Sequence, residues 1–294
     1  MTTPADLRAD FNQFSTSILD PERLAQIAAA AEVRRDWLSA TVETSIAESR
    51  HTLHVIENHL DAADRLLEVG SGLGITSAFL AASGFDITSI EPGGPGFERH
   101  QQVNPLLRAS LGIDHPHHFV AVEDVDRADI RGAFDLIFSN NVIEHVDDVT
   151  RALTTLNEML KTGGIMIHHC PNYRVPYEPH FGIPLLPWRP AATAKFLPER
   201  ISSSGLWASL NFVTTRTVTD VGEQCGAGVQ FEQGVLADAF ARLREPEFGE
   251  RHPILRRFAA GLSVIDPVVR RIPASWSTPM TFTWQPPKPT GSRT

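Results

Sequence analysis

Residues 66–74 read Leu-Leu-Glu-Val-Gly-Ser-Gly-Leu-Gly, and this stretch decides the fold. An apolar strand runs into three glycines at alternate positions, and a helical pattern begins at Ile75. Glycine permits the sharp turn between them and lets a ligand approach the backbone, because no Cβ stands in the way. Exposed N–H groups at the start of a helix favour a negatively charged or electron-rich ligand. The stretch therefore predicts a strand–turn–helix unit that binds a ligand at its turn.

The spacing of the glycines and a later acid narrow the class of ligand. The dinucleotide fingerprint is GxGxxG, whereas Ile75 follows Gly74 here and leaves the pattern GxGxG. Glu91 ends the second predicted strand, 21 residues after Gly70, where a carboxylate can accept hydrogen bonds from both hydroxyls of a ribose. NAD and other adenosine ligands share that requirement. The alternative is that Glu91 is a solvated strand end.

Around this turn, short apolar runs alternate with helical segments, which predicts an α/β fold with a parallel sheet covered by helices on both faces. Residues 1–60 read as two or three helices packed on that core. The alternation stops after Cys170, and residues 171–190 hold six prolines among aromatic residues. We therefore expect an N-terminal helical segment (1–60), a ligand-binding domain (61–286) with a lid insertion (171–213), and a frayed tail (287–294). The predicted strands are at 66–70, 87–91, 119–123, 134–140, 164–170, 229–231 and 280–284.

Composition excludes several classes of function. The chain has 294 residues with 26 Lys and Arg against 35 Asp and Glu, so its formal net charge of −9 argues against a general nucleic-acid partner. The cysteines, Cys170 and Cys225, cannot build a disulfide framework, and no CxxC pair indicates zinc. No apolar signal core begins the sequence, and no run approaches the roughly 20 apolar residues of a membrane span. These features predict a cytoplasmic protein.

Several motifs in the same order resemble one large family. Residues 68–74 are similar to the first motif, E/DxGxGxG, of class I S-adenosylmethionine-dependent methyltransferases. Residues 134–137 (FDLI), 142–146 (VIEHV) and 161–164 (KTGG) resemble later motifs of that family, with Thr162 in place of a proline. The resemblance covers about residues 62–172. It implies a Rossmann-like, doubly wound sheet of seven strands, mostly parallel with an antiparallel last strand, and methyl transfer from S-adenosyl-L-methionine.

The resemblance also implies positions for the cofactor. The glycine turn would pass close to its methionine part, and Glu68 would help to hold the ammonium group. Glu91 would bind the ribose, and either Glu123 or Asp124 would accept a hydrogen bond from the adenine amino group. Asn140 and Asn141, at the end of the fourth strand, would lie beside the sulfonium. The implied cofactor residues are Glu68, Gly70, Gly72, Gly74, Glu91, Glu123, Asp124 and Asn140.

Methyl transfer to oxygen requires a base, and histidine titrates in a suitable range. The candidates are His145, His168, His169 and His180, with Glu144 as a carboxylate neighbour. We favour His145 or His180 as the base for a hydroxyl acceptor. The alternative for His145 is that it packs at the start of the next helix.

Metal binding is not expected. In ubiquinone-type O-methyltransferases the corresponding acidic segment is linked to a divalent metal, and Glu144, Asp147 and Asp148 could supply oxygen ligands. We favour the simpler interpretation that the two aspartates cap the following helix. The run His168-His169-Cys170 does not suit a metal, because successive strand residues point to opposite faces.

The segment after strand five predicts a lid over the acceptor. Prolines, aromatic rings and titratable groups together suit a pocket wall that excludes water. The alternative is a proline-stiffened surface loop. The expected acceptor-binding residues are Tyr173, Tyr177, Glu178 and Phe181 of this segment, with His169 before it.

A late basic segment alternates with apolar residues, which predicts at most a weak peripheral contact with an anionic membrane. The alternative is a helix that covers the sheet. The basic residues are Arg251, Arg256, Arg257, Arg270 and Arg271.

We expect a small-molecule, glycan or lipid-like acceptor, methylated at a hydroxyl oxygen. The competing functions are an NAD(P)-dependent oxidoreductase and a cofactor-binding module without catalytic activity.

Overall fold

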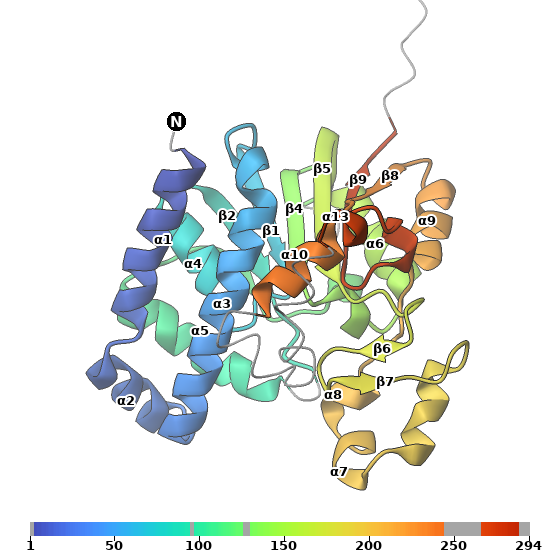
Figure 1. The fold of residues 1–294 in the computed structure, drawn as a ribbon. Helices are drawn as coiled ribbons and strands as arrows, with labels where there is room; N and C mark the ends of the chain where they lie inside the picture. The colour runs from blue at the N-terminus through green and yellow to red at the C-terminus, as the bar shows by residue number, and fades with distance from the viewer. Residues whose placement is uncertain (1–2, 95–96, 126–129, 244–265, 288–294) are drawn as a thin grey trace, which may run out of the picture. The chain divides into compact units, whose positions relative to one another are not determined.

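The structure is a computed structural model that describes residues 3–94, 97–125, 130–243 and 266–287 (Figure 1). The chain divides into two compact units. The first comprises Met1–Asn140 and Glu158–Ile167, and the second comprises Asn141–Asn157 and His168–Thr294.

A seven-stranded sheet has the strand order β3-β2-β1-β4-β5-β9-β8. Strand β1 pairs in parallel with β2 and β4, and β2 pairs in parallel with β3, whereas β8 and β9 are antiparallel. Strand β5 passes from the first unit into the second at Ile167. The predicted sheet, mostly parallel with an antiparallel last strand, is confirmed. The strands are β1 (Arg65–Val69), β2 (Asp86–Ile90), β3 (His117–His118), β4 (Phe134–Asn140), β5 (Leu160–Cys170), β8 (Gly228–Phe231) and β9 (Met280–Gln285).

Three helices precede the sheet, where the sequence predicted two or three. They are α1 (Pro4–Ile18), α2 (Pro21–Ala30) and α3 (Arg35–Leu60), drawn in blue in Figure 1. Helix α2 begins where a side-chain acceptor and a proline occur together. The Asp20 carboxylate accepts a hydrogen bond from the backbone N–H of Arg23, 2.8 Å away, and Pro21 occupies the first turn, where its missing N–H costs nothing.

Apolar burial holds these helices to the strands of the first unit. Leu38, Leu53 and Ile56 of α3 are buried in one core with Leu66 of β1 and Phe138 of β4. Helices α4 (Ile75–Ala82) and α5 (Glu98–Leu111) contribute to the same core. Burial of one such side chain contributes about 2 kcal/mol, so packing rather than helix propensity stabilises this arrangement.

One strand of the first unit differs from its predicted position. The apolar run at 119–123 predicted a strand, but β3 covers His117–His118, and Val122–Asp124 form the short 3-10 helix η1. Backbone hydrogen bonds fix this position: the N–H of Ser89 donates to the carbonyl of Pro116 at 2.9 Å, and the N–H of Glu91 donates to the carbonyl of His118 at 3.0 Å. The Ser89 hydroxyl oxygen also lies 2.7 Å from Nδ1 of His117. The pairing ends there because the N–H of Val120 turns back to donate to the carbonyl of His118.

The second unit contains short elements in the segment predicted as a lid. Strands β6 (Tyr177–Glu178) and β7 (Ile183–Pro184) form an antiparallel pair, so part of this segment has regular structure. The helices of the second unit, inside and outside that segment, are η2 (Ile143–His145), η3 (Pro190–Phe196), α7 (Glu199–Ser202), α8 (Gly205–Ala208), α9 (Thr215–Gln224), α10 (Val235–Arg242), α13 (Asp266–Val269) and η4 (Ala274–Trp276). Helix α6 (Val149–Met159) begins in the second unit and ends in the first.

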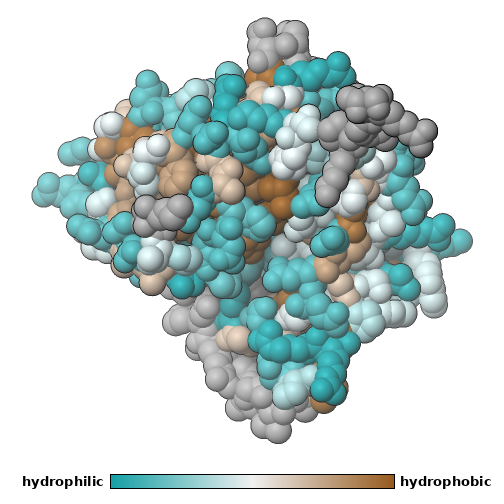
Figure 2. All heavy atoms as spheres, turned by 90° about the horizontal axis from the view of Figure 1, so that it is seen from above, coloured by the Kyte–Doolittle hydropathy of each residue, from teal (hydrophilic) through white to brown (hydrophobic). Residues whose placement is uncertain are grey.

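One face of the molecule is largely polar. Figure 2 shows hydrophilic atoms over most of one face, with hydrophobic atoms gathered in smaller areas. Within the described ranges, every helix is too short or too polar to cross a membrane.

Candidate functional site

The glycine turn after β1 has the backbone conformation that its sequence predicts. Gly70, Gly72 and Gly74 have φ angles of 70°, 55° and 75°, a region that side chains with a Cβ disfavour. The N–H of Gly70 donates to the carbonyl of Ile90, 2.8 Å away, and the N–H of Gly74 donates to the carbonyl of Ser71, 2.7 Å away. The turn is therefore fixed to the end of β2 and leads directly into α4.

Glu91 joins the turns that follow β1 and β2. Its Oε2 accepts a hydrogen bond from the N–H of Gly72 at 2.7 Å, and its Oε1 accepts one from the N–H of Gly93 at 2.8 Å. Burial raises the pKa of this carboxyl, against the effect of the two N–H donors. A carboxylate offers about four lone-pair positions, so Glu91 can accept further hydrogen bonds from a ligand.

Glu68 is buried beneath the same turn. Its Oε2 accepts a hydrogen bond from the N–H of Ser77, 3.1 Å away in the first turn of α4. Burial raises the pKa of Glu68 to about 7, although hydrogen bonds from Ser77 and Thr76 act in the opposite direction. A nearby cation would favour the ionised form of this carboxyl.

The remaining predicted ligand residues of the first unit lie on η1 and at the end of β4. Glu123 is buried, whereas Asp124 is exposed. Asn140 donates from Nδ2 to the carbonyl of Glu48 in α3, 3.3 Å away. Because β1 and β4 are parallel, with Glu68 opposite Phe138, Asn140 lies at the same sheet edge as the glycine turn.

Asn104 of α5 also contacts this turn, and the sequence analysis did not identify it. This fully buried side chain donates from Nδ2 to the carbonyl of Gly72 at 3.0 Å. A Cβ placed on Gly74 would lie 2.7 Å from the same Nδ2. Only the folded structure reveals the contact between Asn104 and the turn, because Asn104 follows Gly74 by 30 residues in the sequence.

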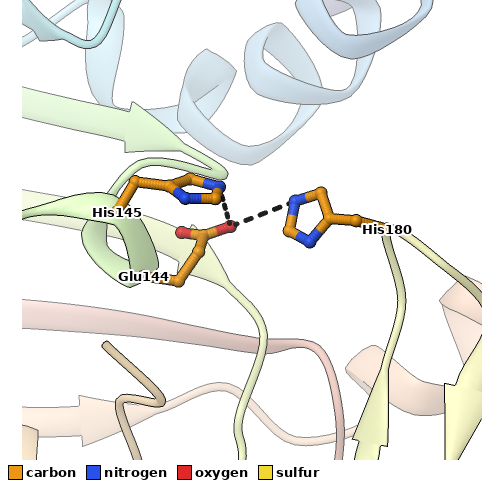
Figure 3. A group of neighbouring side chains, drawn as sticks. All are labelled: Glu144, His145 and His180. Atoms are coloured by element: carbon orange, nitrogen blue, oxygen red, sulfur yellow. Dashed lines mark ion pairs between the residues drawn. The ribbon is translucent and has the colours of Figure 1, made fainter. Parts of the chain in front are cut away.

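In the second unit, Glu144, His145 and His180 come together (Figure 3). Nε2 of His145 lies 3.9 Å from Oε1 of Glu144, and Nε2 of His180 lies 3.8 Å from the same oxygen. Glu144 and His145 belong to η2, whereas His180 lies between β6 and β7. The sequence predicted all three as catalytic, and the structure brings them together in one cluster.

Hydrogen bonds orient both imidazoles. Nδ1 of His180 lies 2.6 Å from Oε1 of Glu178, and Nδ1 of His145 lies 2.8 Å from Oγ of Ser209. Burial, followed by the proximity of His180, lowers the pKa of His145 to about 3, so His145 is neutral at physiological pH. A neutral imidazole can bind a metal or accept a proton, but a pKa of about 3 makes His145 a weak base in this state of the protein. Glu144, His145 and His180 each offer one ligand atom within 4.8 Å of the others, a set that could coordinate a divalent cation.

Residues 207–212 support this cluster, although no motif in the sequence marks them as site residues. The N–H of Asn211 donates to the carbonyl of Glu144 at 2.9 Å, and its Nδ2 donates to the carbonyls of Ile143 and Val146. The rings of Phe212 and Tyr173 lie 5.2 Å apart, and those of Trp207 and Phe181 lie 6.2 Å apart. These aromatic rings form an apolar surface within the second unit.

Other predicted residues lie elsewhere in the second unit. His169 is buried, with Nδ1 2.8 Å from the hydroxyl of Thr281 in β9, and its neighbour His168 packs 5.1 Å from the Phe282 ring. Tyr177 is half-buried in β6.

Two further predicted groups have specific surroundings. Asp148 accepts a hydrogen bond from the N–H of Arg151 at the start of α6, as expected for a helix cap, and Asp147 is exposed. Within the basic segment, Arg251, Arg256 and Arg257 lie outside the described residues. Arg270 forms ion pairs with Asp238 at 2.7 Å and Asp266 at 2.9 Å.

Comparison with known proteins places this chain among methyltransferases. A family model described as a methyltransferase domain matches residues 13–208. An uncharacterised protein of Mycobacterium tuberculosis (strain ATCC 25618 / H37Rv) is 35% identical over 199 residues, which are 65% of this chain and 61% of that protein. The match thus spans about three fifths of that relative's length.

Two further comparisons name an activity. A ubiquinone biosynthesis O-methyltransferase of Paramagnetospirillum magneticum (strain ATCC 700264 / AMB-1) is 34% identical over 102 residues, 35% of this chain and 38% of that protein. The solved geranyl diphosphate C-methyltransferase of Streptomyces coelicolor A3(2) has a TM-score of 0.52 at 14% identity, and the match covers 82% of this chain and 78% of that one. At that identity the second comparison supports the fold alone.

Proposed function

The chain belongs to the methyltransferase-domain family of class I S-adenosylmethionine-dependent methyltransferases, and from this membership we propose that it methylates a hydroxyl oxygen of a small-molecule, glycan or lipid-like acceptor. The observation that carries the cofactor half of the proposal is the glycine turn of the first unit, bounded by the buried carboxylates Glu68 and Glu91.

The residues of the turn fit the cofactor. Three glycines with positive φ leave the backbone open to a ligand, and Glu91 keeps lone pairs for the ribose hydroxyls. Among the described residues, the buried hydroxyl of Ser71 has no hydrogen-bond partner, which suits a polar ligand at the turn. S-adenosylmethionine, when bound, supplies an electrophilic methyl group on a positively charged sulfur. We assign its binding to Glu68, Gly70, Gly72, Gly74, Glu91, Asn140 and either Glu123 or Asp124.

The acceptor half of the proposal rests on the cluster of Glu144, His145 and His180. A hydroxyl becomes a better nucleophile as its proton leaves, and an imidazole Nε2 can take that proton. The Glu144 carboxylate stabilises the imidazolium that results. The O-methyltransferase among the relatives supports oxygen as the target. We assign acceptor binding to Tyr173, Tyr177, Glu178 and Phe181, within a lid of residues 171–213, together with His169, which precedes that segment.

A binding panel separates the proposed function from its alternatives. We expect S-adenosylmethionine and S-adenosylhomocysteine to raise the thermal unfolding midpoint of the whole chain, and NAD and NADP to leave it unchanged. The opposite pattern would identify an oxidoreductase. Transfer of a labelled methyl group to metabolite and lipid extracts then tests turnover. Binding without transfer to any extract would favour the cofactor-binding module.

The role of the imidazoles needs its own variants. We expect His145→Ala together with His180→Ala to lower turnover about 100-fold or more, because general bases contribute about 10²–10⁴-fold, and to leave S-adenosylhomocysteine binding unchanged. His54→Ala on the exposed side of α3 is the matched control. Turnover near that of the unaltered chain in the double variant would contradict a hydroxyl base at this cluster.

The same cluster supports a second role, because its three ligand atoms could hold a divalent cation. A cation there would orient an acceptor hydroxyl and lower its pKa. Removal of metal with a chelator, followed by addition of Mg²⁺, Mn²⁺ or Zn²⁺, distinguishes the two roles. Turnover that survives chelation supports proton transfer to histidine, whereas turnover restored by one cation supports the metal.

A further inference from the structure

Glu178 is a buried carboxylate with three hydrogen-bond donors around it. Its Oε1 lies 3.1 Å from the hydroxyl of Tyr173 and 2.6 Å from Nδ1 of His180, and its Oε2 accepts from the N–H of Phe181 at 2.9 Å. Glu178 has no solvent-exposed surface. A carboxylate with this set of neighbours acts as an acceptor, so the hydrogen between Glu178 and His180 belongs to Nδ1 of the imidazole.

Ser209 imposes the same arrangement on the other imidazole. A serine hydroxyl has one hydrogen to donate, and Oγ of Ser209 lies 2.9 Å from the backbone carbonyl of Leu206, which can only accept. The Ser209 hydrogen is therefore directed to Leu206. Both contacts of Ser209 are satisfied together when Nδ1 of His145 donates and Oγ of Ser209 accepts across the 2.8 Å between them.

We propose that Glu178 and Ser209 are positioning residues that hold His180 and His145 with a hydrogen on Nδ1, so that each imidazole exchanges its other proton at Nε2, beside Glu144. Both Nε2 atoms lie within 4 Å of one carboxylate oxygen. The two imidazoles thus direct their exchangeable positions to one place, although they come from segments 35 residues apart in the chain.

This arrangement specifies the chemistry of the acceptor, and this consequence rests on the proposed function. Carboxylate oxygens and deprotonated Nε2 atoms are acceptors, so the cluster selects a group that brings a hydrogen. A hydroxyl meets this requirement, and its proton passes to one Nε2, whose imidazolium is held by hydrogen bonding at Nδ1 and by Glu144. An ether or a carboxylate has no hydrogen to offer there. The site therefore favours an acceptor that presents an O–H or N–H group, and the proposed function takes the hydroxyl among these.

The tautomers can be measured directly on the full-length protein by long-range ¹H–¹⁵N NMR of the histidine rings at neutral pH. We expect Nδ1 of both His145 and His180 to show the chemical shift of a protonated nitrogen. An Nδ1 of either ring with the shift of a bare nitrogen overturns the proposal for that ring. The unaltered protein suffices for this measurement, so the proposal does not depend on whether a variant folds.

Two variants assign each positioning residue to its own ring. In Glu178→Gln a neutral amide replaces the charged carboxylate next to Nδ1 of His180, so the His180 signals should change while those of His145 stay. Ser209→Ala should change His145 and leave His180. Tyr173→Phe is the matched control, because it removes one donor to Glu178 and keeps the contact of His180. Unchanged His180 signals in Glu178→Gln would refute the role of Glu178.

Kinetics provide the second readout. For Glu178→Gln we expect a fall in kcat of about 10–100-fold, the range for loss of a residue that orients a functional histidine, with KM for S-adenosylmethionine unchanged. A rise in the KM for either substrate with kcat unchanged would mean that Glu178 acts only on substrate binding. That result would overturn its role in orienting the base. If the tautomers are as expected but no acceptor is ever methylated, the proposed function fails and the positioning assignment stands.

Discussion

At the scale of single residues, the absence of a side chain at Gly74 leaves room for Asn104, whose amide contacts the glycine turn. Gly74 has a φ of 75°, and the space where its Cβ would lie is already filled by the amide of Asn104. That amide also holds the carbonyl of Gly72, so α5 supports the turn from behind. A side chain at position 74 would therefore strain the backbone and also displace the residue that supports it.

We expect Gly74→Ala to lower the free energy of unfolding by about 2–4 kcal/mol, through strain at positive φ and overpacking against Asn104. Binding of S-adenosylmethionine should weaken about tenfold or more. Gly84→Ala is the matched control, since Gly84 also has positive φ but nothing lies within 4 Å of its Cβ position. It should lose about 1–3 kcal/mol and keep its affinity. Urea unfolding and calorimetry measure both effects, and equal affinities for the two variants would contradict the role of Asn104.

At the scale of elements, local patterns predicted some parts of the chain much better than others. The unit from β1 to α4 follows from residues 66–82 alone, because the apolar run, the glycines and the helical pattern are consecutive. Strand β3 was misplaced because its position depends on backbone hydrogen bonds to β2, such as that from the N–H of Ser89 to the carbonyl of Pro116, rather than on the apolar run that follows it. The cluster of Glu144, His145 and His180 was predicted as a set of residues, but its supports were not.

Those supports were missed for a physical reason. Ser209 and Asn211 contact η2 across more than 60 residues of chain, and neither belongs to a motif that marks a function. A serine or an asparagine in a loop is common, so only the folded structure reveals what its side chain bonds.

The contact between Asn211 and η2 leads to a prediction for this element. Asn211→Ala removes the hydrogen bonds to the carbonyls of Ile143 and Val146, and should lower the free energy of unfolding by about 2–3 kcal/mol. Asn211→Asp keeps the acceptor for Val213 but lacks the amide donors, so it should be at least as unstable. Asn58→Ala, on the exposed side of α3, is the control. Compared with the unaltered chain, amide hydrogen exchange at residues 143–146 should be faster in both Asn211 variants and unchanged in the Asn58 control.

At the scale of the whole molecule, the distribution of charge matters more than its total. The formal charge of −9 does not show where the carboxylates lie. In the structure, Glu68 and Glu91 are buried around the glycine turn. Several histidines are buried as well. Burial lowers the pKa of His115 and His117 to about 4 and that of His168 and His169 to about 3. The structure therefore contains more groups that resist protonation than groups that resist ionisation.

These histidines predict that the protein loses stability in acid. Their pKa values are lower in the folded state than the unfolded value of 6.5, so the unfolded chain binds protons first and stability falls as pH drops below 6.5. At pH 5 one fully buried histidine such as His168 costs about 2 kcal/mol. Glu68 acts oppositely, because its raised pKa costs stability as pH rises from 4.5 towards 7, and the raised pKa of Glu91 acts in the same direction. These are two carboxyls against five histidines, since His145 acts with the four named above. Urea unfolding at pH 7.5, 6 and 5 should show the loss, and His168→Leu should reduce it whereas His54→Leu should not. Equal stability at pH 7.5 and pH 5 would show that these side chains are not buried as neutral imidazoles.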